Sequence, residues 1–461
     1  MPDSSNQADL LRFLPRPRIV AVDNREEELK LIWKALFRLG LPCLPMEYDE
    51  QDGLKKPDLW KSERLRIIFL DLNLTDIESP PSASRLVGPI AEVLAGLAPE
   101  GPYLLIFWTK HPSLVKETLK LLPKRRPSVP LPAAYTLIDK QPFLPIDGEH
   151  DLVQLQASLT EALSKNALLL GPLAWESEAE GAAVKTINGI HGLVAVPQLD
   201  GTAQKDKDLR NVLKTLAASA WGKQNAKDNP GASVTSGLAH LLLDHIDYTQ
   251  IDHGYTDVWR GALTGGWNSS LPSMAPPAKL NSQCLLDLNC KIQECRGAWL
   301  EFTPKALRSR TIFRDWLGST RRGLAEEFIN PPGRGAGRIL KMVKLGLLEC
   351  TAVCDYNNNK APLRRYILCS RIPINLGQYI KWEDPSRDTK HNAIYRMKTV
   401  FIDHDEFHLF LNFRYAISLP AGHNLLKSEM AEAIFRVRSK VLADITARFA
   451  AHTTRPGILD F

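Results

Sequence analysis

Residues 67–74 read IIFLDLNL, which is the pattern of a buried strand that ends in an acid. A short run of branched apolar residues is typical of a strand covered on both faces, as in a parallel sheet. Asp71 then falls just after the strand, at the edge where open α/β sheets place their chemistry. These residues therefore predict both a fold class and a candidate site residue.

Two other apolar runs have the same form, IVAVDN at residues 19–24 and YLLIFWT at residues 103–109. Between the first two strands, the spacing predicts an amphipathic helix at residues 25–39 with three glutamates in its first turn. Parallel strands end at one edge of their sheet, so we expect Asp23, Asp71 and Thr109 to lie together. This part of the chain predicts an α/β doubly wound parallel sheet.

The order strand-Asp-Asn, strand-Asp-x-Asn-Leu, strand-Thr and then Asp-Lys resembles the receiver domain of two-component response regulators. The resemblance covers roughly the first third of the chain and implies a flavodoxin-like fold over residues 1–150. It also implies a phosphoryl group accepted on Asp71, with Thr109 and Lys140 responding to it. The expected cofactor is Mg²⁺, bound by Asp23, Asn24 and Asp71, because Mg²⁺ prefers a few oxygen ligands.

The chain departs from the receiver pattern at three positions. Asn24 replaces the second acid of the pair, Lys110 follows Thr109 where the family has a small residue, and Pro142 comes one residue late. The loss of one charge predicts a weakened Mg²⁺ site. The alternative is a pseudo-receiver that binds partners without accepting phosphate.

Length and composition place the whole chain among folded proteins of about three domains, since 461 residues exceed one compact core. No apolar run approaches the length of a membrane span, and the first residues are polar, so we expect a cytoplasmic protein without a membrane partner. Seven cysteines without a Cys-x-x-Cys pair predict neither a disulfide scaffold nor a zinc site.

The rest of the chain divides into two predicted parts. Residues 151–262 show apolar residues three and four apart, which predicts a helical middle domain. Residues 280–461 mix strand and helix patterns and predict an α+β domain that ends in a long helix over residues 425–449.

Residues 305–344 hold ten basic residues against three acidic ones, a local balance of +7. A predicted helix at residues 338–345, ended by Gly346, precedes two strands with a turn at residues 357–360. This pattern resembles a winged helix-turn-helix over residues 305–370 and makes duplex DNA a candidate partner. The candidate contacts are Arg334, Arg338, Lys341, Lys344, Arg364 and Arg365.

A second polar group lies between two strands near the C-terminal end. This group contains side chains that can bind metals, namely Asp403, His404, Asp405 and His408. The alternative function of a hydrolase or nuclease depends on these residues. A polar turn between strands is the simpler interpretation.

The function predicted from the sequence is signalling without independent catalysis, because no Walker loop, His-Glu-x-x-His or Gly-x-Ser-x-Gly motif is present. A histidine-kinase-like protein is the expected phosphoryl donor, and the chain is expected to act as a regulatory or phosphate-sink component. The remaining candidate partners are duplex DNA and a second copy of the chain. A bacterial stress or antiviral defence system is one setting considered.

Overall fold

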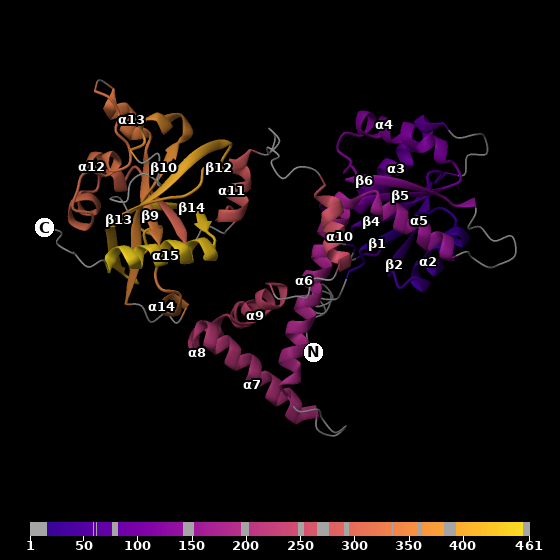
Figure 1. The fold of residues 1–461 in the computed structure, drawn as a ribbon, viewed down its shortest axis with the longest axis horizontal. Coiled ribbons are helices and arrows are strands. Elements are labelled where there is room, and N and C mark those ends of the chain that lie inside the picture. Colours follow the sequence, from indigo (N-terminus) through magenta and orange to yellow (C-terminus); the bar gives the residue numbers. More distant parts are fainter. Residues whose placement is uncertain are drawn as a thin grey trace. The chain divides into compact units, whose positions relative to one another are not determined.

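The computed structural model describes residues 16–58, 60, 62–75, 82–141, 152–194, 202–247, 253–264, 276–289, 295–333, 335–357, 362–381 and 393–454. Contacts divide the chain into two compact units (Figure 1). The first comprises Met1–Lys185 with Asp244–Gly265, and the second comprises Thr186–Leu243 with Gly266–Phe461. Within the described residues, no helix is long and apolar enough to cross a membrane.

A six-stranded sheet forms the centre of the first unit, counted over the described residues. Its strands are β1 Ile19–Asp23, β2 Cys43–Asp49, β3 Gly53–Leu54, β4 Ile67–Leu70, β5 Leu104–Thr109 and β6 Ala134–Asp139. The order is β3-β2-β1-β4-β5-β6, and every pair is parallel except β2 with β3. The five parallel strands thus follow the order 2-1-3-4-5 of flavodoxin-like sheets. The predicted parallel sheet is confirmed.

Helices cover both faces of this sheet because its strands alternate two apolar sets. Val20, Ile68 and Leu105 pack with residues of α3 and α4, whereas Ala21 and Phe69 pack with residues of α2 and α5. The described helices of the first unit are α2 Glu26–Arg38, α3 Ala83–Leu97, α4 Val115–Arg125, α5 Leu152–Ser164, the larger part of α6 Ala167–Gly192, and α10 His253–Ala262, with a short 3₁₀ turn at Pro112–Leu114.

Helices α5 to α10 account for the described parts of the middle region, including α7 Thr202–Trp221, α8 Lys223–Asp228 and α9 Pro230–Asp247. The boundary between the two compact units falls within α6 and α9. The division of the sequence into three domains at residues 1–150, 151–262 and 280–461 stays a prediction.

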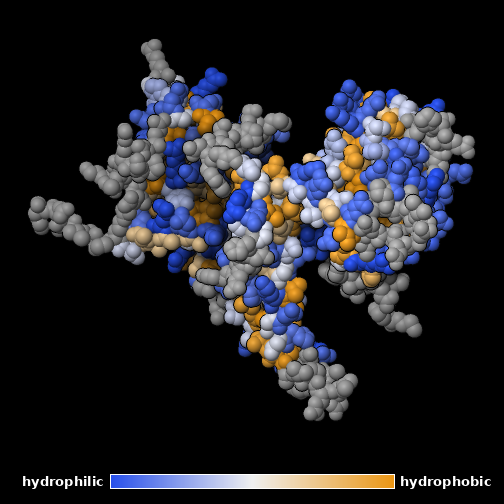
Figure 2. Space-filling model, turned by 45° about the vertical axis from the view of Figure 1, so that its right-hand side comes forward, coloured by the Kyte–Doolittle hydropathy of each residue, from blue (hydrophilic) through white to orange (hydrophobic). Residues whose placement is uncertain are grey.

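The longest of these helices carries large apolar side chains on its surface. Leu168, Trp175 and Val184 of α6 are exposed, and Figure 2 shows hydrophobic residues at the surface among hydrophilic ones. Exposed apolar faces of this kind are typical of contact surfaces.

An eight-stranded antiparallel sheet organises the described part of the second unit, in the order β11-β13-β10-β9-β8-β14-β7 with β12 paired to β13. The strands are β7 Leu286–Asp287, β8 Ala298–Phe302, β9 Lys344–Glu349, β10 Leu363–Pro373, β11 Ile394–Arg396, β12 Val400–Ile402, β13 Asp405–Pro420 and β14 Ala431–Val437. With the helices around it, this unit has a mixed α/β architecture.

Both faces of the second sheet are buried. Leu300 and Leu347 pack with residues of α12, α13 and the π-helical turn Thr311–Trp316, while Trp299 and Leu348 pack with residues of α11 and α15. The helices are α11 Pro277–Leu285, α12 Arg321–Glu326, α13 Ala336–Met342, α14 Val353–Asn357 and α15 Ser439–Thr453, with 3₁₀ turns at Ala306–Arg308 and Ile374–Tyr379.

Two helix predictions for this unit are wrong. The helix expected at residues 338–345 ends at Met342, and Gly346 lies inside β9. The reason is a close approach of backbones, because a Cβ on Gly346 would lie 2.0 Å from the Leu300 carbonyl oxygen of β8. Residues 425–449 do not form the single long helix expected there. They include β14, which pairs with β8, and α15 begins only at Ser439.

The winged helix-turn-helix expected over residues 305–370 is also wrong. The two strands do pair in antiparallel fashion, but they form no projecting wing. β9 lies between β8 and β10, and β10 lies between β9 and β13, so both are interior strands of the large sheet. The local pattern of a hairpin is the same in either setting, and the flanking strands come from distant parts of the sequence.

Candidate functional site

The parallel sheet brings four of the residues singled out in the sequence to one edge. Asp23 ends β1, Asp71 directly follows β4, Thr109 ends β5, and Lys140 directly follows β6. All four are buried, with between 0% and 5% of each residue exposed. Strand ends that lie side by side in a parallel sheet account for this convergence.

The side chain of Lys140 lies among carboxylates. Its Nζ is 2.9 Å from Asp71 Oδ2 and 3.3 Å from Asp23 Oδ2, and it also contacts Glu28 Oε2. Burial lowers the pKa of this ammonium, but the charges of Asp71 and Asp23 outweigh burial and leave the pKa raised. Lys140 therefore stays charged. Its backbone N–H donates to the Thr109 carbonyl at 3.2 Å, which ties the ends of β5 and β6 together.

Glu28 is the site residue that sequence reasoning missed. It lies in the first turn of α2, is buried, and accepts a hydrogen bond from Lys110 Nζ at 2.7 Å through Oε1. Burial raises the pKa of Glu28, but hydrogen bonds from Lys110 and Lys140 outweigh it and lower the pKa. The signal was present as three glutamates immediately after the first strand, although their spacing alone does not tell which one turns inward.

Asp23 has a perturbed acidity. Burial and, after it, the nearby charge of Asp71 raise its pKa to about 6, although the charge of Lys140 opposes this rise. The backbone N–H of Arg25 donates to Asp23 Oδ1 at 3.0 Å, which fixes the carboxylate at the entrance of α2.

Thr109 is buried at the end of β5, and its hydroxyl oxygen accepts a hydrogen bond from the backbone N–H of His111 at 3.1 Å. This bond stabilises the turn that leads from β5 toward α4. Lys110, at the position where the receiver pattern has a small residue, reaches back to Glu28. The departure noted in the sequence therefore supplies a second ammonium beside the cluster.

The donor atoms fit a hard divalent cation. Asp23, Glu28 and Asp71 each offer a carboxylate oxygen, and these oxygens lie within 4.8 Å of one another. Within the described part of the chain they form the one such group of acids, histidines or cysteines. Buried oxygens of Asn24, Asp71 and Asn73 have no hydrogen-bond partner. Of the predicted ligands, Asp23 and Asp71 belong to this group. Asn24, the residue after Asp23, has a buried amide oxygen.

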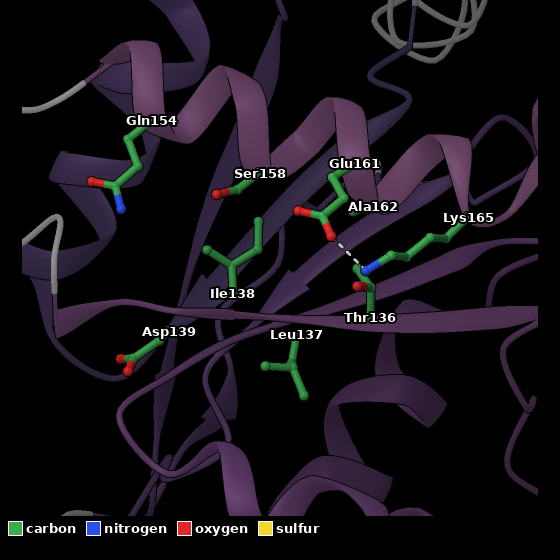
Figure 3. A pocket seen from close by; sticks show the side chains of 9 residues that line it. All are labelled: Thr136, Leu137, Ile138, Asp139, Gln154, Ser158, Glu161, Ala162 and Lys165. Atoms are coloured by element: carbon green, nitrogen blue, oxygen red, sulfur yellow. Dashed lines mark hydrogen bonds and ion pairs between the residues drawn. The ribbon is translucent and has the colours of Figure 1, made fainter.

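A shallow hollow lies next to the cluster but is separate from it. It is bordered by β6 and α5, and Figure 3 shows Asp139 at the strand end and the ion pair of Glu161 with Lys165 on the helix. Lys140 is not among its lining residues.

The described basic residues proposed for DNA contact lie toward the two ends of the β9–β10 ladder. Arg338 and Lys341 are exposed on α13, and Lys344 is exposed at the start of β9, opposite Arg371. Arg365 and Arg364 lie beyond the other end of the β9–β10 ladder, six and seven residues from Arg371 along β10, or roughly 20–24 Å at the usual rise of a strand. Arg334 lies outside the described residues.

The polar residues between β12 and β13 form a turn. Asp403 and His404 have positive φ angles of 48° and 73°, as in the tight turns that join antiparallel strands. His408 lies within β13, where its Nδ1 is 3.3 Å from the Thr399 hydroxyl oxygen. Among the described residues, this segment supplies no group of three or more potential metal ligands.

Comparisons with known proteins leave this geometry as the main source of functional information. No protein-family model and no curated protein matches the chain. Among solved structures, full-length FixJ from B. japonicum is matched over 55% of this chain and 100% of that chain, with 10% sequence identity and a TM-score of 0.19. A TM-score this low carries no argument for the fold or the function.

Proposed function

We propose that the first unit is a receiver-type domain that accepts a phosphoryl group on Asp71. One observation supports this best: a buried lysine, Lys140, holds its ammonium 2.9 Å from a carboxylate at the end of a central parallel strand. A carboxylate that becomes phosphorylated needs a positive partner for the charge of the transferred group. The residue order in the sequence leads to the same assignment.

The reaction assigned to Asp71 is the transfer of a phosphoryl group from a donor molecule to the Asp71 carboxylate. Oδ1 of Asp71 has no hydrogen-bond partner, so its electron pairs are available to attack phosphorus. A new O–P bond forms on Asp71 while the O–P or N–P bond of the donor breaks, and the leaving group keeps the bonding electrons. With acetyl phosphate, the products are an acyl phosphate on Asp71 and free acetate. Lys140 would pair with the phosphoryl oxygens, and Thr109 lies at the end of the adjoining strand.

Mg²⁺ is the proposed cofactor, with Asp23 and Asp71 among its ligands. When bound, such an ion neutralises charge on the oxygens of the transferring group. The chain contributes a buried group of carboxylates whose oxygens would hold the ion. Its own ammonium groups, Lys140 and Lys110, already offset part of the negative charge.

The biological role proposed is that of a regulatory or phosphate-sink component served by a histidine-kinase-like donor. A pseudo-receiver is the second candidate, and a specific observation favours it: Lys140 is already held by three carboxylates, and Asn24 removes one acid from the expected pair. The two candidates differ in whether Asp71 is labelled.

The test is incubation of the full chain with acetyl phosphate and Mg²⁺, followed by intact mass measurement and peptide mapping. Wild type should gain the mass of one phosphoryl group, and Asp71→Asn should gain none. Asp139→Asn is the matched control, because Asp139 lies at the same edge of the sheet on the side of the hollow. Labelling that persists in Asp71→Asn would exclude Asp71 as the acceptor, and a wild type that stays unlabelled with both acetyl phosphate and a kinase would favour the pseudo-receiver.

A further inference from the structure

Three carboxylate oxygens converge on one positive charge at the edge of the parallel sheet. Asp23 Oδ2, Glu28 Oε2 and Asp71 Oδ2 all contact Lys140 Nζ. They come from β1, from the first turn of α2, and from the residue after β4. Lys140 Nζ therefore marks the point where these elements together hold a cation.

The ammonium does not satisfy the whole cluster. Asp23 Oδ1 accepts from the Arg25 backbone, and Glu28 Oε1 accepts from Lys110. Asp71 Oδ1 is left without a hydrogen-bond partner, although only 5% of Asp71 is exposed. A buried carboxylate oxygen without a partner is costly, and the charged form makes it more so. The cluster therefore has more acceptor capacity than its own donors fill, which points to a positively charged ligand.

We propose that Asp23, Glu28 and Asp71 bind a divalent cation in competition with the Lys140 ammonium, with Glu28 as the third carboxylate of the site. Glu28 supplies the charge that is missing at Asn24, but it does so from the helix instead of the strand end. When the cation is bound, the Lys140 ammonium leaves these three oxygens. The binding site and the position of Lys140 are thus coupled.

This competition predicts a modest affinity in the wild type. Mg²⁺ and Mn²⁺ favour carboxylate oxygens, and three of them suit either ion. The ion must nevertheless displace a lysine that is paired to all three. Removing Glu28 takes away a ligand, whereas removing the Lys140 ammonium takes away the competitor, so the two changes should act in opposite directions.

The experiment is titration of the full chain with Mn²⁺ alone, at low salt and without a phosphoryl donor, with free Mn²⁺ counted by electron paramagnetic resonance. Wild type should bind one equivalent, and Glu28→Gln should bind it more weakly by about tenfold or more, the size of effect caused even by residues that only support metal ligands. Glu27→Gln is the matched control, because Glu27 is exposed in the same helical turn. Absence of Mn²⁺ binding in the wild type, or equal binding by Glu28→Gln, would overturn the site.

The competition has a readout of its own that keeps Lys140 in place. In wild type, Mn²⁺ should increase acetylation of Lys140 by an amine-reactive reagent several-fold, because the ion frees the ammonium from its three partners. Lys120, exposed on α4, serves as the internal reference. Reactivity of Lys140 that is unchanged by saturating Mn²⁺ would refute the competition. Lys140→Met, checked for folding by circular dichroism, should bind Mn²⁺ more tightly than wild type, and equal or weaker binding by the folded variant would also refute it.

The inference deepens the proposed function, because it concerns the same site, but the two fail separately. A chain that binds Mn²⁺ through Glu28 and is never labelled on Asp71 keeps the cation site and loses the receiver assignment. If Asp71 is labelled and Glu28→Gln binds Mn²⁺ as tightly as wild type, the receiver assignment stands and the proposed role of Glu28 is wrong.

Discussion

Glu301 of β8 and Arg371 of β10 form a buried ion pair across the strand that separates them. Arg371 Nη2 donates to Glu301 Oε2 at 3.0 Å, and its Nε donates to the other oxygen. Glu301 lies opposite Gly346 of β9, which is opposite Cys369 of β10. Because Gly346 has no side chain, nothing stands between the two charged groups on that face of the sheet.

The first prediction follows from this burial. Arg371→Met should lower the free energy of unfolding by about 3–5 kcal/mol, because it leaves the Glu301 carboxylate buried without its partner. Arg436→Met is the control, since Arg436 pairs with Asp287 in a partly exposed position and should cost only about 0–1 kcal/mol. Urea unfolding measures both. Equal losses in the two variants would mean that the Glu301 charge finds another partner or water.

The second prediction concerns Gly346 itself. A Cβ there would lie 2.0 Å from the Leu300 carbonyl oxygen, so Gly346→Ala must push β8 and β9 apart. We expect a loss of about 2 kcal/mol or more in the free energy of unfolding. Gly337→Ala is the matched control, because Gly337 lies in α13 with open space around its Cβ position and should be neutral or stabilising by up to about 1 kcal/mol. A stable Gly346→Ala would contradict the close approach of the strands.

The third prediction is a pH dependence centred on Glu349. Burial raises the pKa of Glu349 above its ordinary value of 4.5, although hydrogen bonds from Thr351 and the charges of Arg364 and Arg296 oppose it. The folded state thus binds a proton that the unfolded chain releases. The stability contributed by the protonated Glu349 carboxyl is fully present below pH 4.5 and is lost as the pH rises through the pKa of Glu349 in the folded state.

Glu349→Gln should therefore be more stable than wild type at neutral pH, and this advantage should shrink as the pH falls toward 4.5. Thermal unfolding at a series of pH values measures the difference. Glu432→Gln, at an exposed position on β14, is the control and should follow wild type throughout. An advantage of Glu349→Gln that stays constant with pH would show that the carboxyl does not titrate in this way.

The sequence was most informative where the structure depends on local pattern and on sheet order alone. Apolar runs that end in Asp23, Asp71 and Thr109 predict parallel strands, and parallel strands necessarily place their ends together. The contribution of Glu28 could not be predicted in the same way. Its inward direction depends on how α2 docks on the sheet, which the helical periodicity of one element does not fix.

In the second unit, local pattern was a poor guide because distant strands determine the outcome. The predicted pairing of β9 with β10 is confirmed. These strands are interior strands and not a wing because β8 pairs with β9 and β13 pairs with β10. Gly346 was interpreted as the end of a helix, which is a common role for glycine. Its actual role, permitting contact with β8, involves a residue more than forty positions earlier in the chain.

The last prediction concerns Lys140 as the residue that couples Asp71 to the neighbouring strand. Its side chain contacts Asp71, and its backbone N–H donates to the Thr109 carbonyl, so a change at the carboxylate reaches the ends of β5 and β6 directly. A phosphoryl group on Asp71 would draw the ammonium away from Asp23 and Glu28, because it carries more charge than either. Such differential pairing is what allows one modification to shift a two-state element.

Hydrogen exchange over residues 103–141 should therefore decrease in wild type when beryllofluoride, a phosphoryl mimic, is added with Mg²⁺. Lys140→Ala should lose this added protection, whereas Lys120→Ala, at an exposed position on α4, should retain it. Folding of each variant is checked by circular dichroism, so that loss of response is separated from loss of structure. If wild type shows the same exchange with and without the mimic, then Lys140 does not transmit a signal, and its contacts with Asp23, Glu28 and Asp71 serve only to neutralise buried charge.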